Sequence, residues 1–154
     1  MRRVARKEER YAPGWTRDAL TMMRSRSSSR FAFAAPHIAD GMRVLDIGCG
    51  PGTITAAIAE TVGPNGEVLG VDVHEGQIEE ARRLPRVRAL RQLSFEAGSI
   101  YRLLVEDRSF DMVFSHGLFE HLARPDEALV ELKRVVKPGG LVAISSSDWG
   151  GAEI

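Results

Sequence analysis

The stretch "VLDIGCGPGTIT", Val44 to Thr55, decides how the rest of the chain is interpreted. An apolar run that contains one acid, Asp46, is followed by three glycines within five positions: Gly48, Gly50 and Gly52. Each glycine costs about 0.5–1 kcal/mol relative to alanine in regular structure, so three together need a reason. One glycine is enough for a tight strand-to-helix turn. The three together predict a ligand that comes closer to the backbone than a Cβ would allow.

Outward from this turn, strand-like and helix-like segments alternate along the chain. Continuous apolar runs predict five strands, at residues 42–47, 67–73, 93–98, 110–115 and 141–146. Helical spacing of apolar residues predicts helices at residues 53–63, 75–84 and 125–136, ended by Gly63, by Pro85 and by the turn at residues 137–140. Strands that are apolar throughout, and not alternately polar, indicate a parallel sheet covered on both faces. The fold class is therefore α/β, a doubly wound and mostly parallel sheet.

The segment before this sheet differs from it in charge. Residues 1–30 hold nine Arg and Lys against three Asp and Glu, and the remaining 124 residues hold 12 against 18. We expect a helix at residues 16–24 capped by Thr16, and a second helical stretch at residues 31–41 that is disturbed at Pro36. The chain thus divides into an N-terminal helical segment, residues 1–40, and an α/β domain, residues 41–154. Because acids interrupt the basic run, a solvated amphipathic helix is favoured over a nucleic-acid-binding tail.

The composition excludes several classes of protein. Cys49 is the only cysteine, so no intrachain disulfide can form, and a reducing compartment fits. No apolar run approaches the roughly 18 residues of a membrane span, and the basic N-terminus leads into no hydrophobic stretch. We expect a cytoplasmic protein that binds neither nucleic acid nor membrane.

Asp72 is the second indication of a ligand. It ends the second predicted strand, 22 residues after Gly50, where ligands bind in sheets of this kind. A carboxylate there can accept hydrogen bonds from both hydroxyls of a ribose. Alternatively, Asp72 to Glu75 has the spacing of a capping box, in which Asp72 starts the next helix. Taken with the glycines, and with the helix N-terminus at residue 53, the pattern favours a nucleoside ligand.

Four ordered motifs resemble one enzyme family, the class I S-adenosylmethionine-dependent methyltransferases. "VLDIGCGPG" resembles the first motif of this family, "VLGVDV" the second and "FDMVFSHGLFEHL" the fourth, and "ELKRVVKPGGLVAIS" resembles the segment around the fifth strand. The resemblance covers residues 40–150 and implies a Rossmann-like methyltransferase fold. Within the class, the chain is most similar to the small-molecule group that includes the ubiquinone and menaquinone C-methyltransferases.

The resemblance implies a set of residues around S-adenosylmethionine. The methionine part of the cofactor would be surrounded by Asp46, Gly48, Cys49, Gly50 and Gly52. Asp72 would hold the ribose, Val73 and His74 would flank the adenine, Gly98, Ser99 and Ile100 would close over it, and Ser115 and His116 would line the site. The family commonly has aspartate at the position of Ser99, which accepts from the adenine amino group. Serine is a weaker acceptor there.

These motifs predict a methyltransferase that acts on a small molecule by direct methyl transfer. His116 is the candidate to contact the acceptor or act as a base; alternatively, it only shapes the pocket wall.

Tyr11 and Trp15 either form a lid or anchor their helix to the core. His116 and His121 point about 140° apart on a helix, so no metal site is expected. The alternatives are a cofactor-binding module that is catalytically impaired and, less favoured by the glycine spacing, a nicotinamide-dependent oxidoreductase.

The family's sheet has seven strands, and this chain ends at Ile154, shortly after the fifth predicted strand. We therefore expect a domain that is incomplete at its C-terminus, with the last strands missing. An apolar strand at residues 141–146 would then form an open edge, which can pair with another chain. Self-association through this edge and low turnover are the corresponding predictions.

Overall fold

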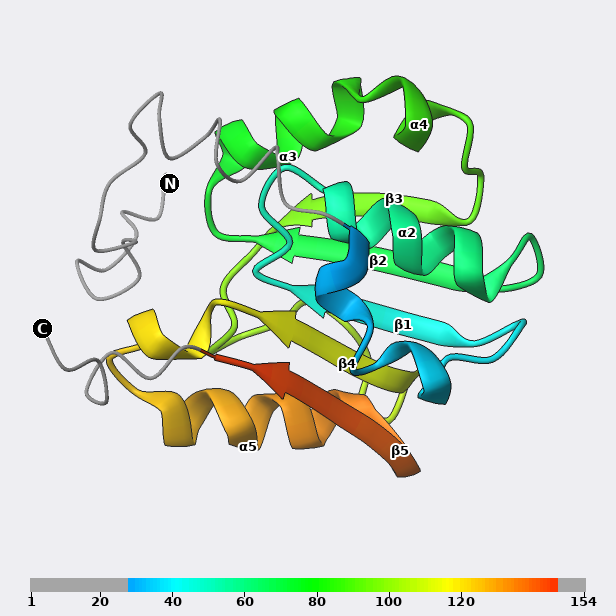
Figure 1. Ribbon diagram of the computed structural model, residues 1–154. Coiled ribbons are helices and arrows are strands. Elements are labelled where there is room, and N and C mark those ends of the chain that lie inside the picture. The colour runs from blue at the N-terminus through cyan, green and yellow to red at the C-terminus, as the bar shows by residue number, and fades with distance from the viewer. Residues whose placement is uncertain (1–27, 147–154) are drawn as a thin grey trace, which may run out of the picture.

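A five-stranded parallel sheet forms the centre of the protein (Figure 1). The structure is a computed structural model, and it describes residues 28–146. In chain order the strands are β1 (Arg43–Ile47), β2 (Glu67–Asp72), β3 (Leu93–Ala97), β4 (Phe110–His116) and β5 (Val136–Ser145). Their order across the sheet is β3-β2-β1-β4-β5, and every neighbouring pair is parallel. The predicted doubly wound α/β fold is confirmed.

Helices cover both faces of this sheet (Figure 1). On one face lie α2 (Thr53–Val62) and α3 (Glu75–Arg83), and on the other lies α5 (Pro125–Val135). Short elements complete the described part: α4 (Pro85–Arg88) and the 3-10 helices η2 (Ser28–Phe31), η3 (Ala35–His37) and η4 (Phe119–His121). Connections between parallel strands are right-handed. The strands from β1 to β3 are added in one direction across the sheet, and β5 is added beyond β4 in the opposite direction. The helices of the two halves therefore lie on opposite faces.

The strands bury side chains on both faces, as their apolar runs predict. On β1, Val44 packs with the residues of α2, and Leu45 packs on the opposite face with Leu132 of α5. Met112 and Val113 of β4 divide in the same way. All these side chains are almost fully buried. Two apolar layers therefore fix the sheet between the helices, and the site lies at an end of the sheet rather than on a face.

The helical stretch expected at residues 31–41 is present only as short 3-10 pieces. The structure has two separate 3-10 helices there, η2 and η3, and Pro36 lies in the first turn of η3. Proline removes a backbone donor and disfavours helical backbone in the residue before it, so the apolar pattern cannot continue as one α-helix. The helix expected at residues 16–24, and the residues Tyr11 and Trp15, lie outside the described residues.

The start of β5 also differs from the expected turn. Val136 already pairs with Phe110 of β4, and Leu141 pairs with Met112, so four residues of β5 stand opposite one residue of β4, Asp111. Asp111 holds this bulge, because Lys137 donates to its carboxylate at 2.8 Å and Arg43 of β1 donates its backbone N–H at 2.8 Å. The residues of the predicted turn thus form a bulge inside β5.

β5 lies at one edge of the sheet, and β3 lies at the other. Leu141 of β5 is one of the more exposed large apolar side chains in the described part of the chain. Self-association through this edge stays a prediction, as do the division at residue 40 and the incomplete C-terminus. No helix within residues 28–146 is both long enough and apolar enough to cross a membrane.

Candidate functional site

The glycine turn between β1 and α2 has left-handed backbone at three positions. The φ angles of Gly48, Gly50 and Gly52 are 75°, 53° and 82°. A Cβ on Gly48 would lie 2.9 Å from the side chain of Leu118, and a Cβ on Gly52 would lie 2.8 Å from the ring of Phe95. Backbone conformation therefore favours glycine at all three positions, and neighbouring side chains leave no room for a Cβ at Gly48 and Gly52. The inference that one glycine suffices for the turn is wrong, whereas the prediction that a ligand approaches these glycines stays a prediction.

Substitution of Gly52 tests this structural role. Gly52→Ala should destabilise the fold by about 2–3 kcal/mol, because alanine resists positive φ and its Cβ would press on Phe95 and Ala81. Urea unfolding measures this loss. Gly76→Ala is the matched control, since a Cβ there meets nothing within 4 Å. It should leave stability unchanged or raise it by up to about 1 kcal/mol. Equal stabilities of the two variants would contradict this interpretation.

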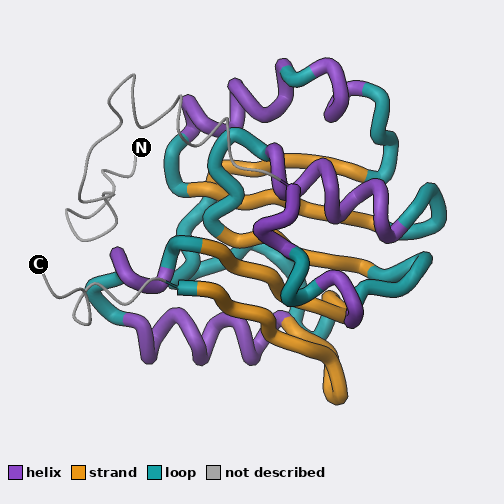
Figure 2. Tube along the Cα trace, viewed as in Figure 1, coloured by secondary structure: helices purple, strands orange, loops and turns teal. Residues whose placement is uncertain are grey.

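The turn forms one side of a small pocket between the carboxyl ends of β1 and β4. Five of the predicted site residues line it: Asp46, Gly48, Cys49, Gly50 and His116. Pro51, Thr53, Ile54 and Phe114 complete the wall. The chain reverses its direction across the sheet between these two strands, which is where doubly wound sheets bind ligands. The loops that follow the strands gather at the same end (Figure 2).

The N-terminus of α2 faces this pocket through Thr53 and Ile54. Gly52 is its N-cap residue, and no side chain caps the helix. The first N–H groups of a helix have no partner within it and carry partial positive charge, so they attract anionic groups. This wall of the pocket is therefore suited to a carboxylate or another anion.

Asp46 lines the pocket and is only 3% exposed. The Thr55 hydroxyl donates to its Oδ2 at 2.7 Å. Burial raises the pKa of Asp46 to about 7, the Thr55 hydrogen bond opposes this shift and the nearby charge of Asp72 adds to it. Thr55 is a site residue that the sequence interpretation missed. Its position in the first turn of a helix directly after the glycines is the signal that could have found it.

Cys49 packs inside the protein rather than presenting a reactive thiol. Its Sγ would lie 3.1 Å from a Cβ on Gly70 of β2, and its side chain belongs to the apolar cluster that contains Phe95. Burial raises the pKa of the Cys49 thiol well above its ordinary value, and the carboxylates of Asp46 and Asp72 raise it further. A thiol in this state is a poor nucleophile.

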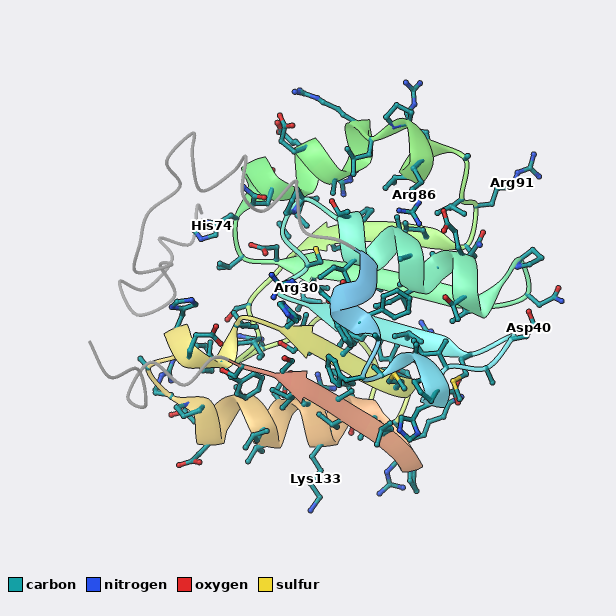
Figure 3. All side chains as sticks on the ribbon, viewed as in Figure 1. Arg30, Asp40, His74, Arg86, Arg91 and Lys133 are labelled. Atoms are coloured by element: carbon teal, nitrogen blue, oxygen red, sulfur yellow. The ribbon has the colours of Figure 1, made fainter. Side chains whose placement is uncertain are left out.

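Asp72 joins the glycine turn to the loop that follows β2. Its Oδ2 accepts the Gly50 N–H at 2.9 Å, and its Oδ1 accepts the His74 N–H at 2.9 Å. α3 begins at Glu75 with His74 as its N-cap residue, so Asp72 does not occupy the N-cap position that the capping-box reading requires. Burial raises the pKa of Asp72, and the N–H groups of His74 and Gly50 partly offset this. Among the labelled residues, His74 lies at the end of the sheet where the strands end (Figure 3).

The segment after β3 lies beside Asp72. The Gly98 N–H donates to the Asp72 carbonyl at 2.9 Å, which places residues 98–100 next to the loop of Val73 and His74. The Ser99 hydroxyl accepts the Tyr101 N–H at 3.3 Å. The Ile100 side chain is buried in the core on the α5 side of the sheet. Gly98 and Ser99 thus adjoin the predicted ribose and adenine residues.

Ser115 and His116 end β4 and point to opposite faces of the sheet. His116 lines the pocket. Ser115 is 1% exposed and shares the α5 face with Val113, two residues earlier. Its hydroxyl has no hydrogen-bond partner among the described residues. The Ser115 side chain therefore lies away from the pocket, and only its backbone can line the site. Within residues 28–146, no group of three or more His, Cys, Asp or Glu is placed to hold a metal ion.

A family model described as a methyltransferase domain matches residues 38–152, most of the chain. The chain belongs to this methyltransferase family. The prediction made from the four sequence motifs is confirmed, and the fold is that of S-adenosylmethionine-dependent methyltransferases.

Curated relatives of this methyltransferase agree. An uncharacterised methyltransferase of Schizosaccharomyces pombe is 44% identical over 112 residues, which cover 69% of this chain and 40% of that protein. A demethylmenaquinone methyltransferase of Symbiobacterium thermophilum is 35% identical over 108 residues, covering 70% of this chain and 43% of that protein. The methyltransferase chain therefore spans less than half the length of these two relatives.

Solved structures show the same fold. A SAM-dependent methyltransferase from Aquifex aeolicus matches with a TM-score of 0.76 and 25% identity, covering 85% of this chain and 72% of that one. A phosphoethanolamine N-methyltransferase of Haemonchus contortus, solved with phosphoethanolamine and S-adenosylhomocysteine, matches with a TM-score of 0.70 and 25% identity. The match covers 87% of this chain and 28% of that protein.

Proposed function

We propose that this methyltransferase transfers the methyl group of S-adenosylmethionine to a small-molecule acceptor in the cytoplasm. One observation carries the proposal. Asp72 accepts the N–H of Gly50 in the glycine turn, and this turn lines the pocket between β1 and β4. A nucleoside with an amino-acid tail needs an acidic residue for its hydroxyls and a separate polar pocket for its charged end. Asp72, and the adjacent pocket with Asp46 in its lining, support this assignment.

The chain's own groups fit the two ends of the cofactor. Asp46 would face the ammonium group of the methionine part, and the N-terminus of α2 would face its carboxylate. Asp72 would accept the ribose hydroxyls, with Val73, His74, Gly98 and Ser99 around the adenine. When bound, S-adenosylmethionine supplies a methyl group that its sulfonium already activates.

With such a donor, the protein's part in catalysis is mainly positioning. Holding an acceptor in line with an activated group can contribute about 7–11 kcal/mol to the lowering of the barrier. His116 lines the pocket and is the candidate to orient the acceptor or to take its proton. The named activities of relatives, demethylmenaquinone methyltransferase and ubiquinone biosynthesis O-methyltransferase, support a small aromatic acceptor.

Two experiments test the proposal. Calorimetry should show binding of S-adenosylmethionine and none of NAD; the reverse result would favour the nicotinamide-dependent oxidoreductase. Transfer of a radiolabelled methyl group from S-adenosylmethionine to a panel of small phenols and quinols should then yield labelled product. Binding without transfer to any acceptor, in the chain and in its His116→Ala variant alike, would favour the catalytically impaired binding module.

Ser99→Asp should tighten binding of S-adenosylmethionine about fivefold, because a carboxylate accepts from the adenine amino group more strongly than a hydroxyl does. Calorimetry measures the change. Ser94→Asp, on the exposed side of β3, is the control and should leave the affinity unchanged. Unchanged or weaker binding by the Ser99 variant would show that this side chain does not face the adenine.

A further inference from the structure

Gln77 is a buried amide whose oxygen the fold leaves unused. It lies in the first turn of α3, and its side chain is 4% exposed. Its Oε1 has no hydrogen-bond partner among the described residues. A buried amide oxygen without a partner is unfavourable, and native proteins rarely keep one without a reason.

Gln77 lies in the part of α3 nearest to the candidate site. Ala81 follows one helical turn later on the same face of α3, and its Cβ lies 2.9 Å from where a Cβ on Gly52 would stand. α3 starts at the end of the sheet where β2 ends, so Gln77 lies nearer than Ala81 to Asp72 and the carboxyl end of β2.

Gln77 also occupies a defined place relative to His74. His74 is the N-cap residue of α3, and Gln77 is the third helical residue. In a capping box, a glutamine at this third position accepts the backbone N–H of the N-cap residue. Here the His74 N–H already donates to Oδ1 of Asp72 at 2.9 Å. Gln77 therefore stands at the helix position from which a glutamine can accept the N–H that Asp72 holds.

We propose that Gln77 is a positioning residue for Asp72: its Oε1 takes over the His74 N–H when Oδ1 of Asp72 turns to a ligand hydroxyl. This inference rests on the proposed function. Without a second acceptor, the turn of Asp72 would leave the His74 N–H unpaired, and that loss would weaken binding. With Gln77, the number of hydrogen bonds at His74 is conserved while Asp72 gains a ligand contact. In this proposal, the Oε1 of Gln77, which has no partner among the described residues, is the second acceptor for the His74 N–H.

The test compares S-adenosylhomocysteine with its 2′,3′-dideoxy analogue by calorimetry. The parent should prefer the ligand that carries the hydroxyls. Gln77→Met, which keeps the shape and removes the acceptor, should lower this preference about fivefold, the value of one neutral hydrogen bond. The ligand-free variant should unfold in urea no more easily than the parent, because the oxygen it lost had no partner. Gln77→Glu keeps an acceptor and should keep the preference.

Gln92→Met is the matched control. Gln92 donates to the Ala59 carbonyl at 2.9 Å, just before β3 and away from the site, so its loss should not change the preference for hydroxyls. An unchanged preference in Gln77→Met, or an equal loss in Gln77→Met and Gln77→Glu, would overturn the role of Gln77. Failure of the parent to bind S-adenosylhomocysteine would overturn the proposed function itself, so the two failures are distinguishable.

Discussion

Asp72→Ala should weaken binding of S-adenosylmethionine at least about 100-fold. The ribose has two hydroxyls, and a hydrogen bond to a carboxylate is worth about 1.5–3 kcal/mol, so the loss of both gives an effect of this size. The variant also loses the acceptor that holds the Gly50 and His74 N–H groups. Calorimetry measures the affinity, and circular dichroism checks that the variant is folded.

Asp72→Asn separates the two roles of this carboxylate. It keeps one acceptor oxygen for the backbone and removes the charge, so its fold should resemble that of the parent while its affinity falls. If Asp72→Ala binds the cofactor as tightly as the parent and only unfolds more easily, Asp72 is a structural link between two loops. That outcome would remove the main support for a nucleoside site.

Asp46→Asn should stabilise the ligand-free protein by on the order of 4 kcal/mol at pH 8. The pKa of Asp46 rises from its ordinary value of 3.8 to about 7 in the fold, chiefly through burial. Three pKa units correspond to about 4 kcal/mol of preference for the protonated carboxyl group. Asparagine carries no charge, and it still accepts the hydroxyl of Thr55, so it avoids this cost.

The sign of the pH dependence follows from the raised pKa. Below pH 4 the Asp46 carboxyl is protonated in both states and contributes little. Between pH 4 and 7 the unfolded chain releases this proton while the folded protein keeps it, so the free energy of unfolding falls as the pH rises. Above pH 7 both states are ionised and the cost is constant. The gain from Asp46→Asn should therefore be absent near pH 4 and complete at pH 8.

Asp111→Asn is the control, because its pKa shifts the other way. The Lys137 hydrogen bond is the largest cause that holds the pKa of Asp111 below its ordinary value. Both the folded and the unfolded state of Asp111 are mostly ionised above its ordinary pKa of 3.8, so loss of this hydrogen bond should lower stability slightly and by a similar amount at pH 4.5 and at pH 8. Urea unfolding at pH 4.5 and pH 8 measures both variants. A stability difference between Asp46→Asn and the parent that does not change with pH would contradict the buried, protonated carboxyl group.

The sheet was predictable because each strand is a continuous apolar run between polar turns. β1 and β4 bury side chains toward α2 on one face and toward α5 on the other. Adjacent residues of these strands, such as Val44 and Leu45, are therefore both apolar. Local exceptions were not predictable from periodicity. Pro85 ends α3 as expected, but it also starts α4, since proline suits the first turn of a helix. The bulge of β5 depends on Asp111, a contact between residues far apart in the chain.

The part of the site that lies at the carboxyl ends of the strands was predictable. Asp46, Gly50 and His116 meet at one pocket, because parallel strands bring their carboxyl ends to the same edge of the sheet. Side-chain direction was the harder part. Ser115 was predicted beside His116, and the alternation of a strand turns it to the other face.

Two aspects of the site lay beyond the sequence for physical reasons. The glycines suggested a close ligand, but the sequence did not show that Leu118 and Phe95, from segments far along the chain, approach Gly48 and Gly52. Gln77 looks like an ordinary helical residue in the sequence. Only the structure shows that Asp72 already holds the donor that Gln77 would otherwise take.

The central claim is that S-adenosylmethionine binds where Asp72 holds the glycine turn. Titration of the ¹⁵N-labelled chain with S-adenosylhomocysteine, followed through the backbone amides, tests it most directly. The Gly50 and His74 N–H groups both donate to Asp72, so their signals should shift most, together with those of the first turn of α2. Saturating ligand that shifts neither signal, or shifts only residues away from the β1–β4 pocket, would contradict the account.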